Sequence, residues 1–575
     1  MTEALKRDSR GLRGTIVEEL ANSQAHFSAS ATGVLKFHGI YQQDDRDLRK
    51  QRPERAYSAM VRVGIPGGRL TAEQYLELDR LADDIGAGAL RITSRQDLQY
   101  HYVSKHSLAE LIAQLHAIDL TTLAACGDVV RNVVACAAPI VSGRPDLWPF
   151  VTELSRELKP RTRAYFEIWL DGERAASLEE EDDPLYGDAY LPRKFKIGFA
   201  HEGDNTTDIY SHDLGFVAHS DSGALAGFTM LAGGSLGQSN GVRASHPWLA
   251  DPIGFVRPER LLEAARAAVS IHRDFGDREN RRLARLKYVI EKMGVEWFRL
   301  ELERRLGESL APARRLAWRR AEDYLGWHLQ GDGRWFYGVR VISGRIVDTA
   351  RSGIREIVDR LRPEVRLTAQ QNLLFAGIAP EDRSEVDRLL HAFGIARAAD
   401  LPPMLRHSMA CPALPTCGQA VAESERVWPD VARRIQLAWD AAGLGGEPLC
   451  VRMTGCANGC ARPYTAEVGI VGQSADLYCL YVGGSPLGTR LAELFRDRVR
   501  LDEIAGVLEP LFEKYSAERS TGERFGDWAT RQELALVPAL CPLPSLADAP
   551  TVYPLPAHPG APLPPPPAIE EVASL

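Results

Sequence analysis

The stretch Met60-Val-Arg-Val-Gly-Ile-Pro-Gly-Gly-Arg-Leu70 has a similar counterpart later in the chain, Gly338-Val-Arg-Val-Ile-Ser-Gly-Arg-Ile346. Each copy reads as a β-strand that ends in a glycine-bearing turn. A helical pattern follows each copy, and a second strand pattern completes the unit at residues 90–96 and 365–371. Two strand–helix–strand units of similar length predict a duplicated fold.

Local signals support the helix in each unit. In the first unit, Thr71 and Gln74 have the spacing of a capping box, which starts a helix. An apolar stripe at helical spacing follows and ends before Gly86. The second unit has a comparable stripe that begins at Ile354.

The regions that follow the two units also resemble one another. The matching pairs are Arg131-Asn-Val-Val-Ala-Cys136 with Arg406-His-Ser-Met-Ala-Cys411, Phe195-Lys-Ile-Gly-Phe199 with Cys450-Val-Arg-Met-Thr454, and Gly227-Phe-Thr-Met-Leu-Ala-Gly-Gly-Ser-Leu-Gly237 with Tyr481-Val-Gly-Gly-Ser-Pro-Leu-Gly488. We infer a pseudo-twofold protein with a functional site where the two halves meet. Chance similarity between short glycine-bearing strands is the alternative.

The composition is that of an ordinary globular protein. Of the 575 residues, 45% are hydrophobic and 25% are charged, which fits three or four domains. The net charge of −8 argues against nucleic acid as the main partner. We find no apolar run of about 18 residues and no signal-peptide core, so we expect no membrane span. Nine cysteines are too few for a disulfide framework, and we expect a cytoplasmic location.

Four cysteines near the C-terminus form two short clips. The first clip is Cys411-Pro-Ala-Leu-Pro-Thr-Cys417, and the second is Cys456-Ala-Asn-Gly-Cys460. The Asn458-Gly459 pair makes the second clip a tight turn. Four thiolates are the ligands of an iron–sulfur cluster and also of a tetrahedral zinc ion, so their spacing alone leaves both open. By contrast, Cys450 and Cys479 stand alone and read as buried, inert residues.

Basic and polar side chains gather on the first unit. Arg62 lies on its first strand. Alternation along one strand would place four further side chains on one face: Arg91, Arg95, Gln99 and His101. A solvated strand face is the alternative, but these residues are interleaved with apolar positions, which favours a buried anionic partner. Arginine suits such a partner because its planar guanidinium can bind a carboxylate with two hydrogen bonds.

A second basic group comprises Arg131, Lys194 and Lys196. Lysines two residues apart on a strand share a face and repel one another, so an anion bound between them would relieve that cost. The alternative is an exposed edge strand on which the lysines discourage aggregation.

The cysteine clips closely resemble those of the sulfite and nitrite reductases that contain sirohaem and a [4Fe-4S] cluster, and the resemblance extends over residues 33–528. It implies an α/β (α+β) fold of two pseudo-symmetric halves, with ferredoxin-like half-domains and two sirohaem-binding α/β domains. The expected parts are an N-terminal wrapping segment at 1–55, half-domains at 56–125 and 331–400, a sirohaem and substrate domain at 126–330, a domain with the cluster ligands at 401–540, and a disordered proline-rich tail at 541–575.

The resemblance also implies roles for residues that match the family's motifs. The cluster would be ligated by Cys411, Cys417, Cys456 and Cys460, and Cys460 would also bridge to the sirohaem iron. Sirohaem would be held by residues of the first unit and of the second clip: Arg91, Arg95, Gln99, His101, Asn458 and Cys460. The substrate oxyanion would be bound and supplied with protons by four cations: Arg62, Arg131, Lys194 and Lys196.

The two lysines bear on the substrate. Nitrite-specialised family members tend to have asparagine at the position of Lys196, whereas sulfite members keep both lysines. The resemblance therefore implies an assimilatory sulfite reductase haemoprotein, which reduces sulfite to sulfide with six electrons from an NADPH-dependent flavoprotein or a ferredoxin. The glycine runs lack the G-x-G-x-x-G spacing, so we do not expect NADPH to bind this chain. A ferredoxin-dependent nitrite reductase and a non-catalytic structural zinc protein are the alternatives.

Two further expectations concern single features. Some sulfite reductases carry a covalent tyrosine–cysteine bond beside the substrate, and Tyr41 and Cys126 match its two positions. Residues 271–305 have the charged, apolar-striped pattern of a helical scaffold.

Overall fold

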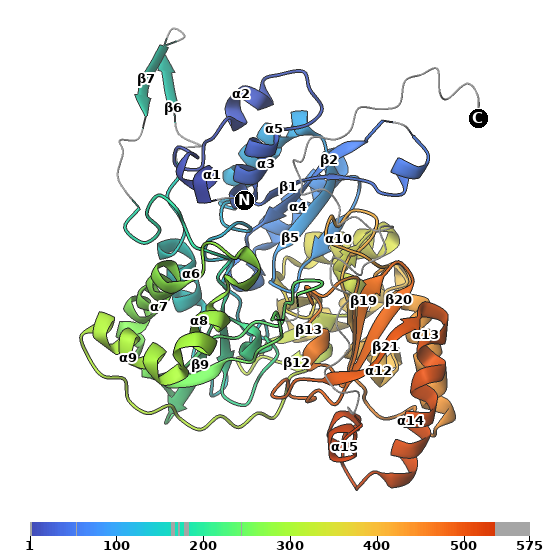
Figure 1. The fold of residues 1–575 in the computed structure, drawn as a ribbon. Helices are drawn as coiled ribbons and strands as arrows, with labels where there is room; N and C mark the ends of the chain where they lie inside the picture. Colours follow the sequence, from blue (N-terminus) through green and yellow to red (C-terminus); the bar gives the residue numbers. More distant parts are fainter. Residues whose placement is uncertain are drawn as a thin grey trace.

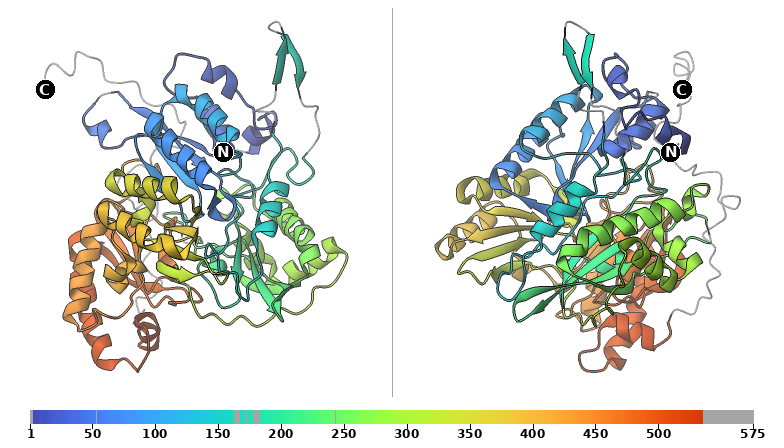
Figure 2. Two further views of the ribbon diagram at one scale, coloured as in Figure 1. Left: turned by 180° about the vertical axis from the view of Figure 1, so that it is seen from behind. Right: turned by 90° about the vertical axis from the view of Figure 1, so that its left-hand side faces the viewer.

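The computed structural model describes residues 3–52, 54–162, 167–170, 173–177, 183–242 and 244–534. The predicted proline-rich tail therefore lies outside the described residues. Figures 1 and 2 show the first half of the chain in blue and green and the second half in yellow to red. The blue sheet lies above two larger α/β units, green and orange, which lie side by side beneath it.

The first half begins with a five-stranded sheet in the order β1-β2-β5-β4-β14. Its strands are β1 (Ile40–Asp44), β2 (Tyr57–Val63), β5 (Leu98–Val103), β4 (Leu90–Ile92) and β14 (Arg345–Ile346). Helices α4 (Ala72–Asp84) and α5 (Leu108–Ala117) belong to the same unit. The predicted capping box starts α4, because the Thr71 side chain accepts from the backbone of Gln74 and the Gln74 side chain accepts from the backbone of Thr71.

The second half repeats this arrangement in the order β12-β13-β16-β15-β3. Its strands are β12 (Gly326–Leu329), β13 (Trp335–Val339), β16 (Leu373–Ile378), β15 (Glu364–Leu367) and β3 (Arg69–Leu70). Helices α10 (Asp348–Leu361) and α11 (Arg383–Ala392) belong to this unit. The predicted repeat is confirmed, and α4 packs against its counterpart α10.

The two halves exchange one short strand each. Strand β3 belongs to the first half but pairs with β15, and β14 belongs to the second half but pairs with β4. A glycine precedes each exchanged strand: Gly68 and Gly344 both have φ of 71°. A side chain on Gly68 would clash with the carbonyl of Leu367, and one on Gly344 would clash with the carbonyl of Ile92. The exchange therefore depends on glycine at both positions.

Each half continues into a larger α/β unit, and the two sheets have related topologies. The first has the order β11-β10-β9-β8, with β8 (Ile197–His201), β9 (Leu214–Asp221), β10 (Ala224–Ala232) and β11 (Asp251–Val256). The second has the order β17-β18-β19-β20-β21, with β17 (Met409–Ala410), β18 (Val451–Thr454), β19 (Val468–Ser474), β20 (Leu477–Val482) and β21 (Glu493–Arg500). In both, a parallel pair is followed by antiparallel strands.

Helices accompany these sheets. The first unit has α6 (Trp148–Glu157), α7 (Leu261–Phe275), α8 (Leu286–Met293) and α9 (Val295–Leu306), and the second has α12 (Pro403–Arg406), α13 (Trp428–Ala441), α14 (Ile504–Glu518) and α15 (Phe525–Arg531). The predicted helical stretch at residues 271–305 contains the end of α7, all of α8 and most of α9. Gly276 follows α7, and Gly294, with φ of 94°, separates α8 from α9.

The chain begins with three short helices, α1 (Glu3–Arg7), α2 (Ile16–Leu20) and α3 (Ala29–Leu35). A two-stranded hairpin, β6 (Glu167–Leu170) with β7 (Glu173–Ser177), follows α6. None of the helices in the described part of the chain is both long and apolar enough to cross a membrane.

Candidate functional site

The turn between β4 and β5 shapes one wall of the site. The Thr93 hydroxyl accepts hydrogen bonds from the backbone N–H groups of Arg95 and Asp97, each at 3.1 Å. Gln96 adopts a left-handed φ of 59°. The predicted single strand is therefore wrong, because β4 ends at Ile92 and the chain reverses.

The reversal still brings most of the predicted residues together. Arg91 lies opposite Gln99 on β5, and Gln99 lies opposite Arg62 on β2, so the three share one sheet face. With its amide oxygen turned toward Arg62, Gln99 accepts from Nε at 2.8 Å and from Nη2 at 2.6 Å. Both ring nitrogens of His101 are buried and have no hydrogen-bond partner among the described residues. Arg95 lies in the turn and not on this strand face, which corrects its predicted position.

Arg95 connects the turn to the neighbouring α/β unit. Its Nη2 donates to the carbonyl oxygens of Asn132 and, at 3.1 Å, of Ile197. Burial lowers the pKa of Arg95 to about 9, and the nearby Arg131 acts in the same direction. A buried guanidinium under this repulsion is suited to an anionic partner.

Tyr41 and Cys126 lie in hydrogen-bond contact. Arg62 donates from Nη1 to the sulfur of Cys126 at 3.0 Å. Arg131 donates from Nε to the carbonyl of Gly127 at 2.8 Å. Burial raises the pKa of Tyr41 to about 12, and Cys126 adds to this, whereas Arg131 and Arg62 oppose it. The structure thus gathers both predicted crosslink residues and two predicted substrate cations.

Lys194 and Lys196 precede β8. Burial lowers the pKa of Lys194 well below its ordinary value, and Arg193 and Lys196 lower it further. Burial also lowers the pKa of Lys196 to about 7, with Arg285 acting in the same direction and Cys460 opposing. Lys194 also faces Arg131. We call the four predicted substrate cations the cation cage: Arg62, Arg131, Lys194 and Lys196.

The sequence reasoning missed Lys36. Burial lowers its pKa to about 8, Arg281 and Arg193 contribute, and Asp128 and Cys126 oppose the shift. Lys36 therefore lies beside the cage. The available signal was its position in the same stretch as Tyr41.

Asp128 was also missed, although it lies between Cys126 and Arg131 in sequence. Its carboxylate accepts from Arg281 through both oxygens, with the contact to Oδ1 at 2.9 Å. Lys6 of α1 lies 3.2 Å from Oδ2, and Arg193 lies 3.8 Å from Oδ1. Asp128 thus holds the chain start and the segment before Lys194 against the loop that carries Arg131.

The two cysteine clips face one another. The backbone N–H of Gly455 donates to the sulfur of Cys411 at 3.3 Å, and the Asn458 amide donates to the sulfur of Cys456 at 3.5 Å. Burial raises the pKa of Cys411 to about 12, and Cys460 contributes. Electrostatic contact extends over all four predicted ligands: Cys411, Cys417, Cys456 and Cys460.

The four thiols are the candidate metal ligands of the site. Among the described residues, no three His, Cys, Asp or Glu side chains lie close enough together to hold one metal ion. Four interacting thiols can ligate either an iron–sulfur cluster or a tetrahedral zinc ion. Cys450 and Cys479 lie outside this group, as predicted: Cys479 is buried, and the sulfur of Cys450 donates to the carbonyl of His407 at 3.4 Å.

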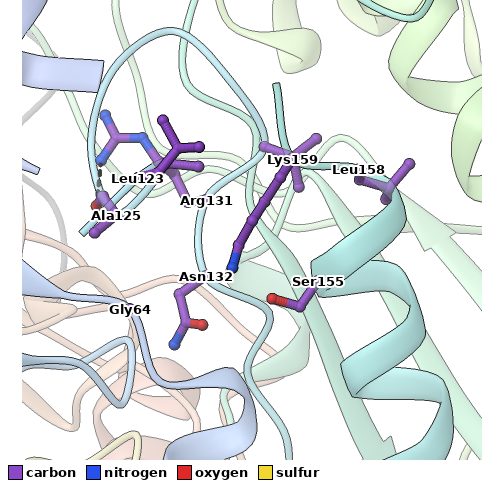
Figure 3. A pocket seen from close by; sticks show the side chains of 10 residues that line it. Gly64, Leu123, Ala125, Arg131, Asn132, Ser155, Leu158 and Lys159 are labelled. Carbon is purple, nitrogen blue, oxygen red and sulfur yellow. Dashed lines mark hydrogen bonds between the residues drawn. The ribbon is translucent and has the colours of Figure 1, made fainter. Parts of the chain in front are cut away.

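A small cavity lies behind Arg131. It offers about 10 Å³ to the centre of a water molecule and is lined by residues that include Asn132, Ser155 and Lys159. Figure 3 shows the amine of Lys159 pointing toward Asn132 and Ser155. The cavity has room for about one water molecule.

The fold and site define a duplicated α/β protein in which buried cations lie beside four interacting cysteines. Two family models match the chain. The nitrite/sulfite reductase ferredoxin-like half domain matches residues 50–118 and 328–393, and the nitrite and sulphite reductase 4Fe-4S domain matches residues 153–310. The chain belongs to the nitrite and sulfite reductase family and is an iron–sulfur protein. The matched 153–310 range lies in the first half, whereas the cysteine clips lie in the second copy of that unit.

Several curated relatives resemble nearly the whole chain. The sulfite reductase [NADPH] hemoprotein beta-component of Myxococcus xanthus is 44% identical over 94% of this chain and 98% of its own length. The sulfite reductase [ferredoxin] of Synechococcus elongatus is 42% identical over 92% of this chain and 89% of its own length. Among solved structures, Mycobacterium tuberculosis NirA matches with a TM-score of 0.74 at 23% identity, over 92% of this chain and 96% of that one. That structure supports the fold.

Proposed function

We propose that this chain is the catalytic haemoprotein of an assimilatory sulfite reductase, which reduces sulfite to sulfide with six electrons. The observation that carries the proposal is that Lys196, a member of the cation cage, lies close to the second cysteine clip. The pKa of this lysine, lowered mainly by burial, responds to Arg95 of the first half and to Cys460 of the second clip. Names of relatives with more than 40% identity support the same activity.

The residues present fit sirohaem beside the cluster. Buried polar atoms without hydrogen-bond partners among the described residues lie on Arg91, Arg95, His101 and Gln371. Such atoms in a native structure call for a polar ligand. Sirohaem carries eight carboxylates, which guanidinium and imidazole groups are suited to bind. We propose that six residues would hold it: Arg91, Arg95, Gln99, His101, Asn458 and Cys460.

The chain's own residues bind the anion and manage protons. When bound, sirohaem and the cluster supply an iron for the substrate and electrons one at a time. The cation cage holds the substrate oxygens, and cations fixed in place before the reaction stabilise negative charge there without reorganisation. Lys196, with a pKa of about 7 because of its burial, is suited to give and regain a proton near neutral pH.

Electrons require a donor protein. The names of the two relatives above carry two donors, NADPH for that of Myxococcus xanthus and ferredoxin for that of Synechococcus elongatus. We propose that this chain, too, takes electrons from an NADPH-dependent flavoprotein or a ferredoxin, and that it works in the cytoplasm.

Turnover of the cofactor-loaded protein with a reduced viologen tests the proposal. We expect a higher kcat/KM for sulfite than for nitrite, with sulfide as the product. A preference for nitrite would assign the chain to nitrite reduction and overturn the role given to the two lysines. A colourless zinc protein without turnover would overturn the redox proposal altogether.

A further inference from the structure

Asp97 is a buried carboxyl group that the proposed reaction does not use. It lies in the β4–β5 turn, and only 1% of its surface is exposed. Its Oδ1 has no hydrogen-bond partner among the described residues. Three arginines from three segments face it: Arg62 of β2, Arg95 of the same turn and Arg131 of the loop after α5. Asp97 thus lies directly behind the residues that would hold the anion.

The second half contains the same turn with a different residue. In the first half the backbone N–H of Thr93 donates to the carbonyl of Asp97, and in the second half that of Thr368 donates to the carbonyl of Asn372, each at 2.9 Å. Gln371 repeats the left-handed conformation of the first turn, with φ of 66°. Asn372 is therefore the counterpart of Asp97.

The surroundings of Asn372 explain why an amide suffices there. Its Oδ1 accepts from Arg340 at 2.8 Å and from the backbone of Val341 at 3.0 Å, and its Nδ2 donates to Asp323 at 2.8 Å. Every polar atom of this amide therefore has a partner. The equivalent carboxyl of Asp97 keeps one oxygen unsatisfied, so the turn alone does not account for an acid at this position.

We propose that Asp97 takes up a proton when an anion binds in the cation cage and thereby sets the charge of the cage. This inference rests on the proposed function. It follows from linkage: an anion neutralises the arginines that stabilise the Asp97 carboxylate, so binding favours the protonated form. By reciprocity, protonation of Asp97 favours anion binding. Asp97 acts through Arg62, Arg95 and Arg131 and is a positioning residue.

The charges around Asp97 allow it to exchange a proton near neutral pH. Burial raises the pKa of Asp97 to about 7, against the opposing effect of Arg62, Arg95 and Arg131. Below this pH the neutral carboxyl leaves the full positive charge of the arginines to the anion. Above it the carboxylate competes with the anion for them. A proton is thus stored next to a reaction that consumes protons.

The test is the Asp97→Asn variant, which the second half indicates will fold because Asn372 occupies the same turn. The KM for nitrite, an anion that stays fully ionised across the neutral range, is measured against pH for both holoenzymes with a reduced viologen. Lys196 titrates in both proteins, so its effect on KM cancels when the native KM is divided by the variant KM. We expect a ratio near one at acid pH that rises by about tenfold as the pH passes 7.

A second readout does not depend on turnover. Infrared difference spectra of the holoenzyme between acid and alkaline pH should contain a protonated carboxyl band that the Asp97→Asn variant lacks. The Asp221→Asn variant, at an exposed ion pair with Arg314, removes the same charge elsewhere and should match the native protein in both measurements. A KM ratio that does not change with pH, or an unchanged carboxyl band, would overturn the inference while sulfite turnover persists. Loss of sulfite turnover in the native holoenzyme would instead count against the proposed function.

Discussion

Arg62 donates a hydrogen bond to the sulfur of Cys126, with 3.0 Å between Nη1 and Sγ. Cys126 is buried, so this contact fixes its sulfur within the site. Tyr41 touches the same sulfur. The three side chains therefore place a phenol beside the Cys126 sulfur and next to the proposed substrate site.

The first prediction is a covalent bond between Tyr41 and Cys126. Its formation removes two hydrogens from the pair, and the two electrons pass to an external oxidant such as dioxygen. The intact mass of the purified protein should therefore be two hydrogen masses below the sequence value. The Cys126→Ser variant should have the intact mass of its own sequence. Its tryptic peptide with Tyr41 should likewise have the mass of an unmodified peptide. A native mass equal to the sequence value would show that the contact stays non-covalent.

The second prediction concerns Lys196. Its replacement in Lys196→Asn removes one cation of the cage, and loss of one such group typically lowers kcat by about 10²- to 10³-fold. We expect a loss of this size in kcat/KM for sulfite and a smaller loss for nitrite, with the visible spectrum retained. Lys292→Asn, on the exposed side of α8, is the matched control. Unchanged sulfite kinetics in Lys196→Asn would remove Lys196 from the cage.

The third prediction concerns the metal. Replacement of any clip cysteine by serine, for example Cys456→Ser, should abolish the acid-labile sulfide and lower the iron content by the four cluster irons, because a [4Fe-4S] cluster needs all four thiolates. Cys479→Ala removes a buried thiol outside the clips and should keep both. Zinc at one equivalent in the native protein, without sulfide, would contradict the cluster.

Much of the fold was predictable because its signals are local. The capping box of Thr71 and Gln74 and the spacing of the clips depend only on neighbours in sequence. The exchange of β3 and β14 was not predictable, since each is a two-residue strand that pairs only when the other half is present. Likewise, the turn after Ile92 depends on the Thr93 side chain bonding the backbone, which competes with strand extension.

The candidate site, too, contains residues that the sequence indicated and residues that it did not. Residue types and spacing indicated Arg91, Gln99 and the lysine pair, and the resemblance to the family implied the whole cage. The role of a charge, however, depends on what surrounds it. Lys36 and Asp97 read as ordinary charged residues in the sequence. Only the tertiary structure buries Asp97 behind three arginines, because they come from segments far apart in the chain.

The fourth prediction is that Asp128→Asn destabilises the protein by about 3 kcal/mol, since the buried Lys6 would keep Glu3 as its one carboxylate partner among the described residues and the half-buried Arg281 would lose a carboxylate that binds it through two oxygens. Burial alone would raise the pKa of Asp128, but Arg281 and Lys6 outweigh it and hold the pKa far below the ordinary value. The stabilisation is therefore complete above the unfolded pKa of about 4 and is lost as the pH falls toward the folded value. Urea unfolding of both proteins should give a constant difference in the free energy of unfolding from about pH 5 upward and a shrinking difference below about pH 4. The exposed Asp221→Asn control should change stability by less than about 1 kcal/mol at any pH. A loss in Asp128→Asn no larger than that of the control would mean that Asp128 does not anchor the N-terminal helix to the loop of Arg131.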